Sequence, residues 1–137
     1  MSGVTGHGSA RAAAVVDPSE LKRVAPGTSA LKVIEKLPGV KVQGVDGFGM
    51  YEWANRITMR VFRTAQIGQT MGGIPLGDMS YGNFDGLGIG RAVDATNLAS
   101  TAVTRGTGSL GTASGNNPGG VVQYSSADPT VRQRFLV

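Results

Sequence analysis

Two short stretches in the first third of the chain repeat apolar residues with a helical period. Residues 17–20 (DPSE) combine a capping aspartate, a proline suited to the first helical position and an acid at a capping-box position. Leu21 and Val24 then form an apolar stripe, and residues 26–27 (PG) end the helix after about two turns. The pattern predicts a short first helix.

A second amphipathic helix is expected to begin with Thr28 or Ser29 as its cap and to end at residues 38–39 (PG). Its apolar positions recur every three residues, and charged side chains separate them. These apolar positions are Leu31, Ile34 and Leu37. A helix with one such stripe packs on a flat apolar surface.

Strand patterns follow the second helix. Residues 40–43 (VKVQ) alternate apolar and polar side chains, and residues 56–62 (RITMRVF) alternate over a longer stretch, which predicts one continuous strand. Weaker strand signals lie at residues 69–76, 100–104 and 121–124, and one more strand could begin within 131–137. No internal repeat is visible.

Glycine-rich segments separate these elements. Glycine makes up 22 of the 137 residues, about twice its usual share of roughly 7%. The segments at 44–54, 77–90 and 106–120 are read as loops. We therefore expect an α+β fold with a small mixed β-sheet of about four strands, two short helices and long Gly-rich loops.

The domain boundaries follow from the same pattern. Residues 1–16 lack periodicity and are expected to be a flexible leader, and residues 17–128 are expected to form the folded domain. Residues 129–137 are expected to be a linker or the start of a further strand. No apolar run reaches the length of a signal peptide core or a membrane-spanning helix, so the chain by itself is expected to be soluble.

The candidate chemistry is sparse, and we expect no enzyme. The chain has no cysteine, and its one histidine, His7, lies in the expected leader, so thiolate chemistry, zinc ligation and a serine–histidine pair all lack their residues. Neither the phosphate-binding P-loop motif nor the hydrolase G-x-S-x-G motif occurs. Residues 83–86 (NFDG) lack the acids that a calcium loop needs at its ends. We expect no metal and no cofactor.

The net charge of +4 is spread along the chain without a basic run, so nucleic acid is not expected as a partner. Residues 106–111 (GTGSLG) match G-x-G-x-x-G, which leaves a nucleotide-binding enzyme fragment as the alternative function. Residues 115–118 (GNNP) would stop the helix that such a site requires.

Five segments, read in order, resemble the plug domain of TonB-dependent outer-membrane receptors. The resemblance covers about residues 17–129. The segments are LPGVKV at 37–42, NRITMRVF at 55–62, GIPLGD at 73–78, VTRGTGSLG at 103–111 and GGVVQY at 119–124. The chain departs from the family pattern at Val61, where glycine is usual, and at Gly72, where aspartate is usual.

The resemblance implies a gate in the cell outer membrane, with the periplasm on its inner side. A plug occludes the transmembrane β-barrel of its receptor, contributes to binding a small-molecule ligand such as a metal chelate, and makes its periplasmic end available to TonB. The ligand class would be a siderophore, a cobalamin or a carbohydrate. No energy-coupling box is recognisable, and the chain ends where the first barrel strand would start, so we expect an isolated or truncated plug.

The resemblance also implies two sets of site residues. Aromatic and polar residues on the loops after the LPGV strand, after the RVF segment and in 77–90 would contact the ligand: Tyr51, Trp53, Phe62, Gln66 and Tyr81. The motif residues that would contact the inner barrel wall are Arg60, Arg105 and Gly106.

Overall fold

The structure is a computed structural model that describes residues 13–51, 54–76, 89, 93–106, 112 and 117–129. Its elements in chain order are β1 (Ala13–Val16), α1 (Pro18–Leu21), α2 (Ala30–Ile34), β2 (Val40–Gln43), β3 (Arg56–Met59), β4 (Phe62–Arg63), the 3-10 helix η2 (Thr64–Gln66), β5 (Ile67–Met71), β6 (Ile74–Pro75), the 3-10 helix η3 (Ala95–Asn97), β7 (Leu98–Arg105) and β8 (Gly120–Ser126). The class is α+β, as the sequence predicts.

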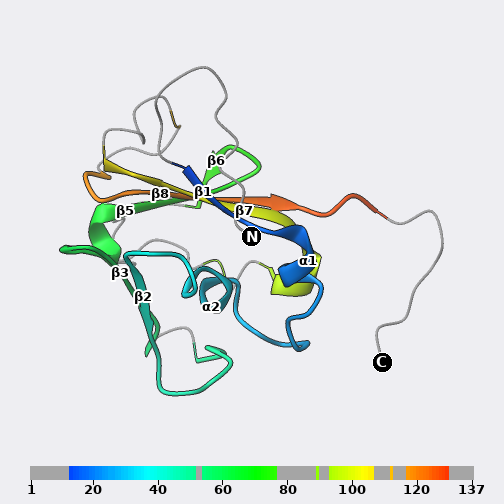
Figure 1. The fold of residues 1–137 in the computed structure, drawn as a ribbon. Helices are drawn as coiled ribbons and strands as arrows, with labels where there is room; N and C mark the ends of the chain where they lie inside the picture. Colours follow the sequence, from blue (N-terminus) through cyan, green and yellow to red (C-terminus); the bar gives the residue numbers. More distant parts are fainter. Residues whose placement is uncertain are drawn as a thin grey trace.

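The larger sheet has five strands in the order β1-β7-β8-β5-β6 (Figure 1). Strands β7 and β8 pair antiparallel over most of their length, whereas β5 runs parallel to β8 with Ile67 opposite Gly120. The sheet is therefore mixed, as expected. The expected number of about four strands is too low, because β2, β3 and β4 form a separate three-stranded antiparallel sheet.

The expected continuous strand over residues 56–62 is wrong. Strand β3 ends at Met59, the chain turns at residues 60–61, and Phe62 begins β4, which pairs back on β3 with Phe62 opposite Met59. The backbone of Arg60 has a φ of 57°, in the left-handed region, which an extended strand does not contain. Alternation alone could not reveal this reversal, because the side chains keep their period of two on both sides of the turn.

The expected leader also needs a correction. Residues Ala13–Val16 form β1, which pairs antiparallel with β7 and places Val16 opposite Thr101. Val16 is buried in the core. A flexible leader therefore cannot include residues 13–16, because these four residues form an edge strand of the larger sheet. Residues 1–12 lie outside the described part of the chain.

Both helices begin at the caps that the sequence indicates. The carboxylate of Asp17 accepts a hydrogen bond of 2.8 Å from the Ser19 N–H at the start of α1. The hydroxyl of Ser29 accepts one of 3.3 Å from the Leu31 N–H at the start of α2, so Ser29 and not Thr28 is the cap. Both helices are shorter than their apolar stripes, with four and five residues.

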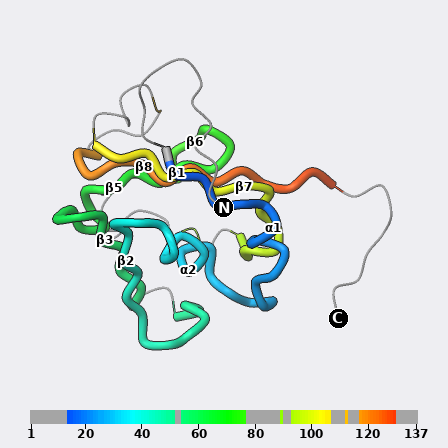
Figure 2. The backbone as a smooth tube through the Cα atoms, in the orientation of Figure 1, coloured from blue at the N-terminus to red at the C-terminus, as the bar shows by residue number. Residues whose placement is uncertain are grey.

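The core lies between the five-stranded sheet on one side and α2 with the three-stranded sheet on the other (Figure 2). Residues that are paired between neighbouring strands of the larger sheet contribute side chains to this core, for example Val103 of β7 and Val122 of β8. From α2, Leu31 and Ile34 pack against them, and Ile57 joins from β3. The two sheets and the helices therefore form one apolar interior that fixes where their connecting loops emerge.

Residues 69–76, expected to hold one short strand, form a hairpin of β5 and β6. Gly72 and Gly73 occupy its turn with φ values of 58° and 83°, and both values lie in the region that glycine adopts without steric cost. The expected loop at 77–90 lies outside the described residues except for Ile89, which is buried.

Candidate functional site

The loop between β2 and β3, residues 44–55, is ordered by one aspartate. The carboxylate of Asp46 accepts hydrogen bonds from three backbone N–H groups of its own loop, at 2.9 Å from Phe48, 3.0 Å from Met50 and 3.1 Å from Tyr51. The bonds from Met50 and Tyr51 lower the pKa of Asp46 below its ordinary value of 3.8. The carboxylate is therefore ionised at neutral pH and fixes the backbone of the loop at residues 48–51.

The same loop is fastened to the start of α2. The Ser29 N–H donates a 2.8 Å hydrogen bond to the carbonyl of Phe48, and the side-chain amide of buried Asn55 donates to the carbonyl of Gly49. Gly49 itself is buried with a φ of 69°, and a Cβ atom there would stand 3.1 Å from Ser29 Cβ and 3.0 Å from Lys32 Cγ. Only glycine fits this contact, so Gly49 docks the loop on the helix.

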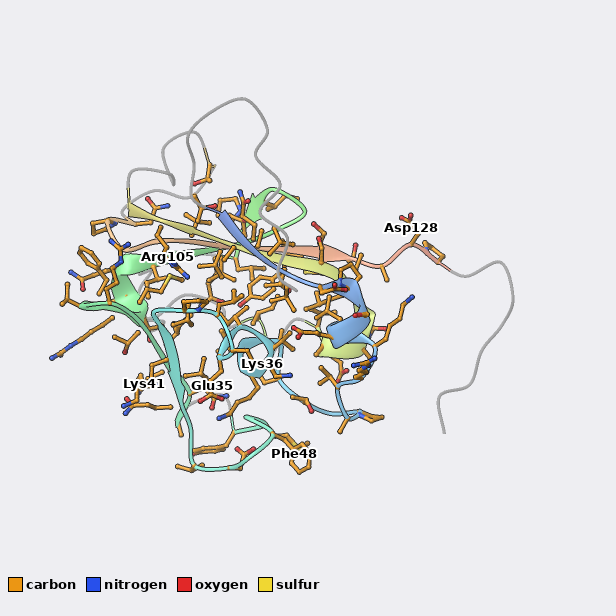
Figure 3. The ribbon with its side chains drawn as sticks, viewed as in Figure 1. Glu35, Lys36, Lys41, Phe48, Arg105 and Asp128 are labelled. Carbon is orange, nitrogen blue, oxygen red and sulfur yellow. The ribbon has the colours of Figure 1, made fainter. Side chains whose placement is uncertain are left out.

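The side chains between these anchors point to solvent. We call Val45, Phe48, Met50 and Tyr51 the apolar display cluster; their exposed fractions are 74%, 51%, 69% and 57%. Figure 3 shows Phe48 at the outer edge of the loop, directed away from the core. Because the backbone polar groups are bound inward, the apolar side chains remain outside, which is the reverse of their usual preference.

Of the expected ligand contacts, the structure places Tyr51 in this cluster, whereas Trp53 and Tyr81 lie outside the described residues. Val45, Phe48 and Met50 were not among the expected contacts, and neither was Asp46, which arranges them. The sequence signal for Asp46 is an aspartate followed by two nearby glycines, since aspartate binds backbone N–H groups of the residues after it in such turns.

The other two expected ligand contacts have structural partners. Phe62 is half-buried, and a Cβ atom on Gly119 would stand only 2.5 Å from its Cβ atom, so the two residues touch. Gln66 is exposed, and its side-chain oxygen accepts a 3.2 Å hydrogen bond from the Arg63 N–H at the start of η2. The contact of Phe62 with Gly119 joins the three-stranded sheet to the residue before β8, whereas the bond between Gln66 and Arg63 is local; neither Phe62 nor Gln66 lies on the β2–β3 loop.

Arg60 and its neighbour Val61 form the exposed tip of the β3–β4 turn. The Arg60 N–H donates a 3.0 Å hydrogen bond to the carbonyl of Gly39, and its side chain is exposed. A left-handed conformation costs an ordinary residue about 1–2 kcal/mol. Val61 is 82% exposed. The turn therefore presents a charge and an apolar group at a strained position.

Arg105 lies at the end of β7 and reaches the α2–β2 connection. One guanidinium nitrogen donates to the carbonyl of Pro38, whereas the Nε atom is buried without a hydrogen-bond partner. Figure 3 shows Arg105 beside the end of the larger sheet. Gly106 follows with a φ of 56° and turns the chain away from the strand. Residues 107–111, which complete the glycine motif, lie outside the described part.

Asp94, which forms an antiparallel β-bridge with Ser29, also binds backbone groups. The carboxylate of Asp94 accepts hydrogen bonds from the Gly27 N–H at 3.1 Å and from the N–H and hydroxyl of Thr96 at 2.8 and 2.7 Å. Burial by itself raises the pKa of Asp94, but these bonds outweigh it and lower the pKa below 3.8. Asp94 thus ties the α1–α2 connection to η3.

Neither a metal-ion site nor a membrane-spanning helix is found in the described ranges. No three His, Asp or Glu side chains there come together as a metal-ion site. No helix in the same ranges has the length and hydrophobicity needed to cross a bilayer.

The fold and its loops define a class of protein: a small α+β domain that displays loops and turns from a mixed sheet. Residues 7–121 match the family model described as the TonB-dependent Receptor Plug Domain. The chain therefore belongs to the family of TonB-dependent receptor plug domains. The receptors of this family are transporters and not enzymes, so the alternative interpretation of residues 106–111 as part of a nucleotide-binding enzyme is wrong.

Solved structures support the fold. The siderophore receptor PirA from Acinetobacter baumannii matches with a TM-score of 0.62 and 22% identity, over 86% of this chain and 17% of that one. A mutant of the ferric enterobactin receptor PfeA from Pseudomonas aeruginosa, in complex with enterobactin, matches with a TM-score of 0.65 and 21% identity, over 89% and 18%. This chain thus spans less than a fifth of their length. Among curated protein sequences, no significant relative is found.

Proposed function

We propose that this chain is the gate of a TonB-dependent outer-membrane transporter: it fills the receptor's barrel, and its β2–β3 loop faces the incoming ligand. The observation that carries the proposal is the apolar display cluster. A loop held by five hydrogen bonds, three to Asp46, one from Ser29 and one from Asn55, would not need to expose four large apolar side chains unless they meet something in the complete receptor.

The ligand is proposed to be a small metal chelate of the siderophore class, with cobalamins and carbohydrates as further classes. Supporting this, a solved receptor with the same fold is recorded in complex with enterobactin. Trp53 follows Tyr51 by two positions and would extend the aromatic surface of the loop. Tyr81, Phe62 and Gln66 remain candidate contacts from other segments.

The barrel wall is proposed to meet Arg60, Arg105 and Gly106. The guanidinium of Arg105 binds a carbonyl and leaves a buried Nε atom unpaired, so no described carboxylate balances its charge. An acidic side chain on the barrel wall would balance the charge of Arg105, because a partly buried cation is stabilised most by a hydrogen-bonded anion. The strain at Arg60 is consistent with a functional position, since strained backbone persists where a side chain must be aimed.

In this mechanism the ligand would contact the β2–β3 loop, shift it relative to α2, and change the periplasmic end of the plug that TonB engages. The loop is connected to that helix through Gly49 and Ser29, so a displacement at the display cluster reaches the core directly.

The experiment is ligand uptake by the receptor that carries this chain, expressed in cells without a competing transporter. Replacing Tyr51 and Trp53 together by alanine is expected to lower uptake at least about tenfold, as loss of two aromatic contacts would. Lys22→Ala, an exposed change on the α1 side, is the matched control and should leave uptake unchanged. Unchanged uptake in the double variant would exclude the loop as a ligand contact.

A further inference from the structure

The charge of the β2–β3 loop restricts its ligand. Residues 44–55 contain two acids, Asp46 and Glu52, and no lysine, arginine or histidine. The pKa of Asp46 is lowered by its hydrogen bonds, so this carboxylate keeps its negative charge at neutral pH. The loop therefore presents an apolar surface with a negative background, although the whole chain carries +4.

Two basic residues that flank the loop have partners of their own. Lys32, whose side chain approaches Gly49, places its ammonium 3.3 Å from a carboxylate oxygen of Glu35. Arg56, at the base of the loop, donates a 3.0 Å hydrogen bond to the carbonyl of Asn55. The Lys32 ammonium is held by Glu35, and residues 44–55 supply no cation of their own, so an anion bound at the display cluster would lose its hydration without a paired charge from the loop.

We propose that the apolar display cluster receives an uncharged chelate with an apolar exterior and disfavours a polyanionic one. The proposal rests on the proposed function and adds the charge class of the ligand. The contact would consist of hydrophobic burial on Phe48, Met50 and Tyr51, which needs no charge. The anchors on Asp46 hold the loop before the ligand arrives, so little conformational entropy is lost on binding.

A trianionic chelate would bind this loop less favourably. Its charge repels the Asp46 carboxylate through solvent, and Val45, Phe48 and Met50 offer no hydrogen-bond donors for its oxygens. Two gallium(III) chelates that share an all-oxygen coordination but differ in net charge therefore separate the proposal from a general affinity for chelates.

The experiment uses the 137-residue chain with carbon-13 in its methionine methyl groups. Met50 is exposed in the cluster, whereas Met59 is buried in β3 and serves as an internal reference. The two probes are a neutral gallium(III) trihydroxamate and a trianionic gallium(III) tricatecholate, titrated to millimolar concentration and followed by NMR. The neutral chelate is expected to shift the Met50 signal with at least about tenfold higher affinity, while Met59 stays in place.

A charge variant sharpens the test. Val45→Lys adds a cation beside the cluster and is expected to raise affinity for the trianionic chelate about fivefold, with the gain reduced in added salt. Ile74→Lys makes the same kind of change at an exposed apolar residue of the β5–β6 hairpin, and should leave that affinity unchanged. Equal gains in both variants would mean that net charge, and not the loop, attracts the anion, and would overturn the proposal.

The remaining outcomes separate the two proposals. If the trianionic chelate shifts Met50 as tightly as the neutral one, the charge class is wrong and the loop remains a ligand contact. If neither chelate shifts Met50, or a shift appears at Met71 instead, the loop is not the ligand contact and both proposals fail.

Discussion

Replacing Gly120 by alanine tests how closely β7 and β8 approach. Gly120 starts β8 opposite Arg105, and its φ of 126° lies in a region that residues with a Cβ atom rarely adopt. A Cβ atom there would stand 2.2 Å from the carbonyl oxygen of Thr104 and 3.0 Å from the Cα atom of Arg105. Both contacts are with backbone, so no side-chain rotation can relieve them.

The magnitude follows from two separate costs. Backbone in a sparsely populated region costs about 1–3 kcal/mol. The overlap with Thr104 requires a shift of the β7–β8 ladder, and overpacking of this kind costs about 1–3 kcal/mol more. Gly120→Ala is therefore expected to lower the free energy of unfolding by about 3 kcal/mol or more, a large part of the total for a domain of this size.

Two other glycines supply matched controls. Gly72 has a φ of 58° with no atom within 4 Å of its would-be Cβ, so Gly72→Ala isolates the backbone cost and should lose about 1–2 kcal/mol. Gly47 has neither a positive φ nor a close neighbour, so Gly47→Ala should change stability by less than about 1 kcal/mol. The three changes add the same methyl group.

The assay is urea unfolding of the 137-residue chain, followed by circular dichroism, with the slope of the transition compared among variants. The expected order of stability is Gly47→Ala, then Gly72→Ala, then Gly120→Ala. If Gly120→Ala unfolds at the same urea concentration as Gly47→Ala, the close approach of the two strands is wrong.

Three further predictions concern Arg60, Asp46 and Asp94. Arg60→Gly is expected to raise the free energy of unfolding by about 0.5–1 kcal/mol in urea unfolding. Glycine removes the strain of the left-handed backbone, but it also increases the entropy of the unfolded chain, which offsets part of that stabilisation. A loss of stability would contradict this prediction. Asp46→Asn is expected to speed hydrogen exchange about tenfold at the three amides bound by this carboxylate, while the amides of β8 keep their rates; uniform acceleration would mean a general loss of stability instead. Asp94→Asn is expected to cost about 1–2 kcal/mol at neutral pH. Because the folded pKa of Asp94 lies below 3.8, its contribution to stability is present above about pH 4 and is lost as the pH falls through the folded value. The stabilities of wild type and variant should therefore converge in acid. If they do not, the hydrogen bonds of Asp94 are misassigned.

The sequence by itself determined the local features of this protein. The caps at Asp17 and Ser29, the alternation of β2 and the glycine-rich loop after it all depend on residues within a few positions of one another. The order of five short motifs also indicated the family, which the match over residues 7–121 confirms. Such features need no knowledge of what lies opposite in space.

Only the tertiary structure decided which side chains are displayed and which are covered. Aromatic residues on a glycine-rich loop more commonly pack inward; here the bonds to Asp46 and Ser29 turned Phe48 outward, whereas Gly119 covered Phe62.

The remaining differences have one physical reason, which is sequence separation. Strand β1 exists because β7 accepts it across the sheet, the turn at Arg60 closes on Gly39, and Arg105 meets Pro38 across 67 positions of the chain. A local pattern carries no information about a partner so far along the chain. The sequence thus determined the elements and the family, and the packing of distant segments decided the strand count, the break at residue 60 and the exposed surface of the loop.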